Sequence, residues 1–448
     1  MNTGCSPAEL TTSLSSLNNQ QQEAVRRIIS AKDYVLLLGM PGTGKSSTLA
    51  FAIRSLVSKG HRVLITSYTH SAVDTLVTKL KDSGMDQSTI LRLGSATSIK
   101  ENLHHLILDH SKLGNTLKLK ERLDQARVVA CTVLAASSDS IISKIEFDYC
   151  IVDEAGQITQ PAAVGALLLS KRFVLVGDDY QLPPLIISSE AQSNGMDVSL
   201  FKRLAEAHPQ AVVTLSAQYR MNAEIMEVSN CLVYDRRLIC GTDAVARGRL
   251  FLPHISPQLP AWLAQCIDPA WPVLFLNTDK LTTMESSPTL ESFNGSVDSS
   301  RGSVVNLSEV EVVKILCRAF VQAGMPMQNL GVVSPYRSQV TAIKAALLTE
   351  EQACTCDVST VDKFQGRDMD AMVLSLVRSN AHGAVGNLLR DWRRVNVAMT
   401  RAKFKLLIIG SLSILENVPI LRELAKLVKE RNYVVDIPSS VSKLAAAE

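Results

Sequence analysis

An apolar run, residues 34–38 (YVLLL), leads directly into Gly39-Met40-Pro41-Gly42-Thr43-Gly44-Lys45-Ser46, and a helical stretch over residues 47–59 follows. A strand, a loop of the form G-x-x-x-x-G-K-[ST] and a helix are, in this order, typical of a phosphate-binding site. The glycines allow backbone N–H groups to surround the β-phosphate, and the helix adds the positive end of its dipole. We therefore expect this loop to bind ATP, with Lys45 contacting the β- and γ-phosphates and the Ser46 hydroxyl coordinating Mg²⁺.

Two adjacent carboxylates follow another apolar run further along the chain. Asp153 and Glu154 come directly after residues 149–152. An Asp at the end of a buried strand can hold Mg²⁺ through water, and a neighbouring Glu can orient and deprotonate the attacking water. Such a pair alone is more often solvated loop charge, but this one stands after a buried strand and downstream of a phosphate loop. The pattern predicts nucleotide hydrolysis with Lys45, Asp153 and Glu154 as catalytic residues.

Short apolar runs alternate with helical stretches along most of the 448 residues. Nearly continuous hydrophobicity with little alternation is typical of strands in a parallel sheet that is covered on both faces. Two such α/β sheets in tandem fit the length, which predicts about two to four domains. The predicted strands are residues 34–38, 63–66, 128–131, 149–152 and 173–176 in the first half, and 273–276, 331–333, 372–377 and 405–409 in the second.

Two stretches interrupt this pattern. Mainly polar or helical residues separate the second and third runs, so we expect a small inserted subdomain at about 68–126. The stretch at about 279–302 is rich in Ser, Thr, Gly and acidic residues, which predicts a mobile loop. The expected organisation is an N-terminal extension (1–16), a first domain (17–213), a second domain (214–435) and a C-terminal tail (436–448).

Charge and composition limit the classes of protein to which this chain can belong. Lys and Arg number 46 and Asp and Glu 43, a net charge of +3, which excludes binding to nucleic acid by bulk charge alone but allows a local basic groove. No apolar stretch approaches the roughly 20 residues of a membrane helix, and the N-terminus lacks the features of a secretory signal. Nine scattered cysteines without zinc-type spacing predict reduced thiols.

A family resemblance becomes specific one strand after the carboxylates. Residues 177–184 (GDDYQLPP) resemble motif III of the superfamily 1 helicases, in which the Gln, here Gln181, senses the γ-phosphate. Residues 17–21 (LNNQQ) resemble the Q motif, which places Gln21 on the adenine. Residues 66–74 (TSYTHSAVD) resemble motif Ia, with Ser67-Tyr68 where an Ala-Pro pair is usual, and residues 130–132 (ACT) resemble motif Ic.

The second half carries the remaining motifs in order. Residues 218–221 (QYRM) resemble the element whose Tyr, here Tyr219, packs on adenine and whose Arg, here Arg220, reaches the γ-phosphate. Residues 334–339 (SPYRSQ) resemble motif IV. Residues 359–368 (STVDKFQGRD) resemble motif V, with Asp368 where many relatives have Glu at the ribose contact. Residues 395–403 (VNVAMTRAK) resemble motif VI, which makes Arg401 the arginine finger.

This set is similar to superfamily 1B, the up-frameshift-like helicases, and within it to the helicase portion of the eukaryotic DNA-replication ATP-dependent helicase/nucleases. The resemblance implies an α/β fold of two tandem RecA-like P-loop NTPase domains, parallel sheets flanked by helices, with a small insertion in the first. It implies an ATP hydrolase that uses Mg²⁺, moves 5′ to 3′ along single-stranded DNA and unwinds duplex DNA in replication and repair.

The resemblance also implies partners and a location. We expect single-stranded and forked DNA as the track and the single-strand-binding replication protein A as a partner. The expected state is a monomer without membrane association, in the nucleus or also in the mitochondrion. The family also carries a nuclease with an iron–sulphur cluster held by four cysteines. This chain has neither that cysteine pattern nor a nuclease core, which predicts the helicase part alone, with the nuclease domain missing.

Strand binding is expected to use hydroxyls, backbone and a few aromatic rings, because stacking on rings tolerates any base. Phe, Tyr and Trp together number only 21. Ser and Thr at strand ends cap helices equally well, and a Tyr in this position can equally well belong to the core. The candidate strand contacts are Thr69, Thr132, Ser334, Tyr336 and Thr360.

Two other functions stay open on the sequence alone. The track can be RNA, since the motifs do not read the 2′-hydroxyl that distinguishes the two nucleic acids. The chain can instead be an ATP-gated nucleic-acid-binding scaffold beside a nuclease. The complete set of hydrolytic residues argues against this second alternative.

Overall fold

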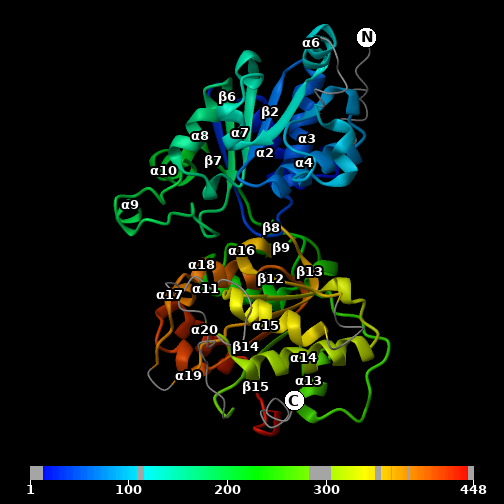
Figure 1. Cartoon of the computed structure of the whole chain (residues 1–448), viewed down its shortest axis with the longest axis vertical. Coiled ribbons are helices and arrows are strands. Elements are labelled where there is room, and N and C mark those ends of the chain that lie inside the picture. The colour runs from blue at the N-terminus through cyan, green and yellow to red at the C-terminus, as the bar shows by residue number, and fades with distance from the viewer. Residues whose placement is uncertain are drawn as a thin grey trace. The chain divides into compact units, whose positions relative to one another are not determined.

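The computed structural model describes residues 14–108, 116–281, 304–348, 355–364, 366–380 and 383–441. The chain forms two compact units, Met1–Gln218 (unit 1) and Tyr219–Glu448 (unit 2), both drawn in Figure 1. Most of the predicted N-terminal extension, the predicted mobile loop from residue 282 on and the predicted tail after residue 441 lie outside the described residues.

Unit 1 is built on a seven-stranded sheet in which all neighbouring strands run parallel, in the order β3-β4-β2-β5-β6-β1-β7. The central strands β2, β4 and β5 are almost wholly buried, as expected of continuous apolar runs in a sheet that is covered on both faces. The strands are β1 (Tyr34–Gly39), β2 (Val63–Ser67), β3 (Ile90–Arg92), β4 (Val128–Thr132), β5 (Phe147–Asp153), β6 (Ser170–Gly177) and β7 (Val212–Leu215).

Helices cover both faces of this sheet (Figure 1) and enclose two separate cores. The first core lies under α2 (Asn19–Ile29), α3 (Lys45–Ser58) and α4 (His70–Asp82). The second lies under α7 (Val133–Ser138), α8 (Gln160–Leu167) and α10 (Leu200–Ala207). Residues 68–126, predicted as an inserted subdomain, contribute α4, the edge strand β3 and α6 (Thr116–Gln125) among the described residues, and α9 (Ser189–Ser193) follows β6.

Unit 2 is built on a second parallel sheet, in the order β12-β11-β13-β14-β10-β15. The two sheets confirm the fold class expected from the sequence. The strands are β10 (Val273–Asn277), β11 (Leu330–Ser334), β12 (Asp357–Thr360), β13 (Met369–Ser375), β14 (Ala402–Gly410) and β15 (Val434–Asp436); the short strands β8 (Ala217–Gln218) and β9 (Ile239–Cys240) belong to neither large sheet.

The helices of unit 2 also lie on both faces of its sheet. One core lies under α13 (Ala261–Ile267), α14 (Leu307–Gln322) and α15 (Arg337–Leu348). On the other side α11 (Ala223–Leu232) packs on β14, and α18 (Trp392–Met399) packs on β13 and β14. The remaining helices are α12 (Asp243–Ala246), α16 (Val361–Phe364), α17 (Asn387–Arg390), α19 (Leu412–Leu415) and α20 (Pro419–Glu430).

One predicted strand ends early. The apolar run 372–377 predicted a strand to its last residue, but β13 ends at Ser375 and Val377 has a left-handed backbone, with φ at 72°. The Val377 N–H donates to the buried carboxylate of Glu309 instead of to a neighbouring strand. A long-range side-chain contact has therefore overridden the strand preference of a β-branched residue.

All seven cysteines among the described residues are free thiols. Within the same residues, none of the helices combines the length and apolar character needed to cross a bilayer.

Candidate nucleotide site and nucleic-acid interface

The phosphate loop, residues 39–46, joins β1 to α3 with two left-handed glycines. Gly42 and Gly44 have φ values of 74° and 76°, and Gly44 is the N-cap of α3, which begins at Lys45. The Lys45 ammonium donates to the Gly39 carbonyl at 2.6 Å, and its chain fills the space that a Cβ on Gly39 would need. The backbone N–H groups at the start of α3 and the Lys45 charge provide what a nucleotide phosphate requires.

Gln21 connects α2 to this loop. Its buried side chain donates from Nε2 to the Thr43 carbonyl at 3.1 Å, and its Oε1 accepts the Asn18 N–H at 3.1 Å. A Cβ on Gly44 would lie 2.7 Å from Gln21 Nε2, so this contact itself requires glycine. The structure thus shows Gln21 as a support of the loop, and its predicted contact with adenine stays a prediction.

The two predicted catalytic carboxylates lie at the end of β5 in different environments. Asp153 is buried, and burial together with the Glu154 charge raises its pKa to about 7, while Lys45 acts in the opposite direction. Glu154 has a left-handed backbone with φ at 53°, and its Oε2 accepts a hydrogen bond from Gln157 at 3.2 Å. Residues other than glycine rarely adopt this left-handed backbone conformation. Those that do are concentrated at functional sites.

Gln181 is held close to this turn by backbone packing. Its Nε2 donates to Asp178 Oδ2 at 2.7 Å, and both side chains are buried. A Cβ on Gly177 would lie 3.0 Å from the Gly156 nitrogen, so the turn after β6 and the turn after β5 approach each other through their main chains. β5, β6 and β1 are neighbours and run parallel. Asp153, Gln181 and the phosphate loop therefore all lie at the carboxyl ends of these strands, on the same side of the sheet. The structure brings these predicted site residues together.

Unit 2 gathers a second group of predicted residues. Arg220 donates from Nε to Asp368 Oδ2 at 3.2 Å and from Nη1 to the Thr400 carbonyl at 3.0 Å. Arg401, the next residue, is buried and donates from Nε to the Val397 carbonyl at 2.9 Å. Arg220, Asp368 and Arg401 therefore lie together, although they are far apart in the sequence.

Tyr219 belongs to the same region of unit 2. Its side chain is exposed, and its ring lies against the backbone of Gly241, where a Cβ would be 2.3 Å from Cε1 of the ring. Any larger residue at 241 would displace the ring. The contact with adenine that was predicted for Tyr219 stays a prediction.

The strand-contact candidates of unit 1 are both helix N-caps. Thr69 Oγ1 accepts the Ala72 N–H at the start of α4, and Thr132 Oγ1 accepts the Ala135 N–H at the start of α7. They lie at the same sheet edge, because β2 and β4 are paired with Ser67 opposite Thr132. Capping was the alternative role expected for such residues.

The candidates of unit 2 also share one sheet edge. Ser334 at the end of β11 pairs with Thr360 at the end of β12. Ser334 is fully buried and accepts the Tyr336 N–H at 3.3 Å, and Tyr336 itself is buried. Thr360 is partly exposed. Placement at one edge agrees with a strand interface there, and the individual contacts stay predictions.

The sequence interpretation missed two buried charge networks beside these edges. In unit 1, Arg92 donates to Asp74 at 2.9 Å and contacts Nδ1 of His70 at 3.1 Å, and neither member of the Arg–Asp pair is exposed. In unit 2, Glu309 is fully buried next to β13. A charged residue inside an apolar strand run, such as Arg92 in ILRLG, is the one local signal that could have indicated such a pair.

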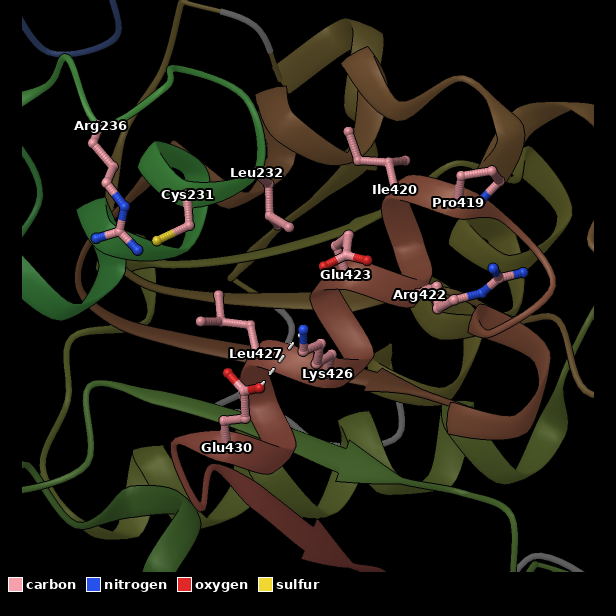
Figure 2. Close-up of a pocket in the computed structure, with 10 residues that line it drawn as sticks. All are labelled: Cys231, Leu232, Arg236, Pro419, Ile420, Arg422, Glu423, Lys426, Leu427 and Glu430. Atoms are coloured by element: carbon pink, nitrogen blue, oxygen red, sulfur yellow. Dashed lines mark ion pairs between the residues drawn. The ribbon is translucent and has the colours of Figure 1, made fainter.

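A separate groove of about 530 Å³ lies between α11 and α20 (Figure 2). Lys426 and Glu430 pair across one turn of α20 there, at 4.0 Å. The groove contains none of the residues predicted for nucleotide or strand binding. It is lined by Cys231, Leu232, Arg236, Pro419, Ile420, Arg422, Glu423, Lys426, Leu427 and Glu430.

Two family models match the chain, and both are described as an AAA domain. One matches residues 16–119 and 110–189, and the other matches residues 196–413. Together they include the phosphate loop, the predicted catalytic carboxylates and the predicted arginines of unit 2. A solved structure of an arterivirus nonstructural protein 10 helicase in complex with DNA is 13% identical, with a TM-score of 0.41 over 87% of this chain and 63% of that chain.

Curated relatives are similar over almost all of this chain. The DNA replication ATP-dependent helicase/nuclease JHS1 of Arabidopsis thaliana is 41% identical over 94% of the chain. The enzymes of the same name, DNA2, from Mus musculus and Homo sapiens are 42% and 40% identical over 95% of it. The chain spans 30% of the plant protein and 40% of each animal protein. Over almost all of its length the chain is thus similar to DNA replication ATP-dependent helicase/nucleases, and it spans less than half of each of these relatives.

Proposed function

We propose that this chain is an ATP-dependent motor that moves 5′ to 3′ on single-stranded DNA and unwinds duplex DNA. One observation carries the proposal. The phosphate loop, the Asp153-Glu154 pair and Gln181 leave neighbouring strands at one edge of the unit 1 sheet. The names of the relatives support DNA as the track.

The proposed chemistry is hydrolysis of ATP at this edge. Lys45 and the loop N–H groups bind the phosphates, and Glu154 orients the attacking water and accepts its proton. The arginine positions of unit 2, Arg220 and Arg401, are proposed to offset the charge that builds on the γ-phosphoryl oxygens. Gln181 is proposed to respond to the presence of the γ-phosphate.

Mg²⁺ fits the residues proposed to hold it. Mg²⁺ prefers hard oxygen ligands, and Ser46 and Asp153 offer a hydroxyl and a carboxylate. Burial and the Glu154 charge raise the pKa of Asp153 by more than Lys45 lowers it, and such an environment favours a divalent cation. Bound there, Mg²⁺ would neutralise charge on the β- and γ-phosphates.

The other partners and the location are part of the proposal. We propose a monomer that acts in the nucleus, with replication protein A as a partner on single-stranded DNA and with a nuclease domain in the full-length protein. The relatives' printed function in DNA replication supports the nuclear location.

Strand-stimulated hydrolysis and strand displacement test the proposal together. ATP hydrolysis should rise with single-stranded DNA more than with RNA of the same sequence, and duplexes with a 5′ overhang should be unwound. Higher stimulation by RNA would make RNA the track. ATP hydrolysis without displacement of the paired strand, on duplexes with either overhang, would favour the ATP-gated scaffold. Lys45→Ala is the matched control, and strand-dependent activity that survived this change would contradict the motor.

A further inference from the structure

A buried carboxylate holds the turn that follows β13. Glu309 on α14 is fully buried, and its Oε2 accepts the Ser375 hydroxyl at 2.6 Å. Its two oxygens also accept the Val377 N–H, at 3.1 Å and 3.0 Å. A polar group is buried at this depth only where hydrogen bonds compensate for lost hydration, so this site is specifically built.

Two more buried side chains belong to the network. Asn306, the N-cap of α14, donates from Nδ2 to the Val377 carbonyl at 3.0 Å. Gln339 on α15 donates to Ser375 Oγ at 3.1 Å and accepts the Asn306 N–H at 2.9 Å. Both the N–H and the carbonyl of Val377 are therefore bound by side chains from α14 and its cap, and α15 holds that cap.

This network stabilises a backbone conformation that valine strongly disfavours. Val377 has φ at 72°, where a β-branched residue is a genuine outlier. Such strain amounts to roughly 1–3 kcal/mol and persists only where surrounding contacts over-determine it, which is common at functional sites. The turn redirects the chain at the carboxyl edge of the sheet, the edge at which Ser334 and Thr360 also lie.

Arg378 directly follows Val377 in this turn. Its Nε and Nη2 donate to the Ala384 carbonyl at 3.2 Å and 2.9 Å, and its side chain is partly exposed. A Cβ on Gly386 would lie 3.1 Å from Tyr336 Oη and 3.4 Å from Arg378 Nη1. The Arg378 guanidinium and the Tyr336 hydroxyl therefore both lie next to Gly386. A positive charge thus stands beside a predicted strand contact.

We propose that Arg378 binds a backbone phosphate of the nucleic-acid strand, and that Glu309 is the positioning residue that sets Arg378 through the strained turn at Val377. The inference rests on the proposed function of the chain. Phosphate contacts supply most of the affinity of a sequence-independent binder. A chain with a net charge of only +3 must place its cations locally, and this buried network is a means of doing so.

The salt dependence of strand binding separates a phosphate contact from a loop support. Asn380 is the matched control, because its Nδ2 donates to the same Ala384 carbonyl at 2.8 Å without carrying a charge. Arg378→Gln should weaken binding of a fluorescent oligodeoxythymidylate and lower the slope of log affinity against log salt by about one. Asn380→Ala should leave that slope unchanged.

Each result bears on a different claim. An unaltered slope in Arg378→Gln, or an equal loss of slope in Asn380→Ala, would overturn the phosphate contact while the unaltered chain still binds the oligonucleotide. An unaltered chain that binds no single strand at all would overturn the proposed function, and this inference with it.

Rescue tests the positioning role of Glu309. Glu309→Gln should weaken oligonucleotide binding, because one amide oxygen cannot replace the two carboxylate oxygens that hold the turn. Adding Val377→Gly should restore binding, since glycine adopts the left-handed conformation without support. If Glu309 only stabilised the fold, the second change would remove a further buried side chain and worsen binding. No rescue in a folded double variant would therefore overturn the positioning role.

Discussion

Glu154 in unit 1 and Val377 in unit 2 are two of the five described residues other than glycine that have a left-handed backbone conformation. Each directly follows or lies just beyond a central strand, β5 or β13, at the edge where predicted site residues gather. Strain of this kind is maintained only by specific contacts. The Gln157 contact to Glu154 and the Glu309 contact to Val377 are such contacts. At both positions the preferred local conformation has given way, and a residue with a proposed functional role lies at or next to the strained position.

Glu154→Gly is expected to separate stability from activity. Glycine adopts the observed φ of 53° without a Cβ, so the free energy of unfolding should stay unchanged or rise by up to about 1 kcal/mol. ATP hydrolysis should fall by about 10²–10⁴-fold, because the proposed general base is lost. Denaturant unfolding and phosphate release measure the two effects. Glu154→Gln should lose hydrolysis without gaining stability, and a Glu154→Gly chain that kept the original rate would contradict the role.

The Arg92–Asp74 pair should matter mainly through the charge left behind when one partner is removed. Arg92→Met leaves Asp74 buried without its partner, which should lower the free energy of unfolding by about 3–5 kcal/mol. The double change Arg92→Met with Asp74→Leu should recover most of this loss, because both buried charges are then gone. Chemical denaturation of the three proteins measures the difference. A double variant less stable than Arg92→Met would contradict the argument.

At the scale of elements, the central strands follow directly from the sequence and the edge strands do not. β1, β2, β4, β5, β6, β10, β11 and β14 match predicted apolar runs, because both their faces are buried. Within the two large sheets, the four strands that were not predicted are the edge strands β3, β7, β12 and β15. They are three or four residues long, and three of them are only partly buried, so they lack a continuous apolar run.

The candidate sites divide in a similar way. The phosphate loop and the Asp153-Glu154 pair could be predicted because their functional groups come from consecutive residues. Glu309 could not, because its partner Val377 is 68 residues away and nothing local in either segment indicates the contact. The end of β13 was therefore predicted wrongly, since strand propensity was the only local information.

A buried lysine in β14 should give the fold a pH dependence. Lys405 donates to the Asp268 and Trp271 carbonyls at 2.9 Å and 2.6 Å, and burial lowers its pKa from 10.5 to about 7. Between these pH values the unfolded lysine is protonated and the folded one is neutral, so unfolding takes up a proton. This residue's contribution to the free energy of unfolding should rise with pH by up to about 1.4 kcal/mol per unit in that window, and it should be lost as pH falls to 7.

Lys405→Met tests this dependence against other groups that titrate in the same range. The two carbonyls lose their donor, which should destabilise the variant by about 1–3 kcal/mol per unpaired group. The difference in free energy of unfolding between the two proteins should widen from pH 7 to pH 9. Denaturant unfolding at several pH values measures it. A difference that stayed constant or narrowed with rising pH would show that Lys405 is charged in the folded state.

At the scale of the whole molecule, the residues predicted for phosphoryl transfer are divided between the two units. Unit 1 holds the phosphate loop and the carboxylates, and unit 2 holds Arg220 and Arg401. A phosphate loop by itself leaves the charge on the transferring group without a cationic partner. The proposed function therefore predicts that nucleotide binding depends on the residues of unit 1, and that hydrolysis also depends on the arginines of unit 2.

Arg401→Ala should accordingly separate binding from hydrolysis. The turnover number should fall on the order of a thousandfold, while the affinity for a non-hydrolysable ATP analogue, measured by calorimetry, should change little, because Lys45 and the loop remain.

Lys403→Ala is the matched control, since it removes a nearby cation that pairs with Asp368 and Asp370 and should leave turnover within a few-fold. Arg401 is also bound to the Val397 carbonyl, so thermal unfolding must show that the variant is folded. Arg401→Lys keeps the charge without the planar fork and should recover only part of the rate. Full activity in folded Arg401→Ala would mean that the cation for the transition state comes from elsewhere, with Arg220 as the next position to change.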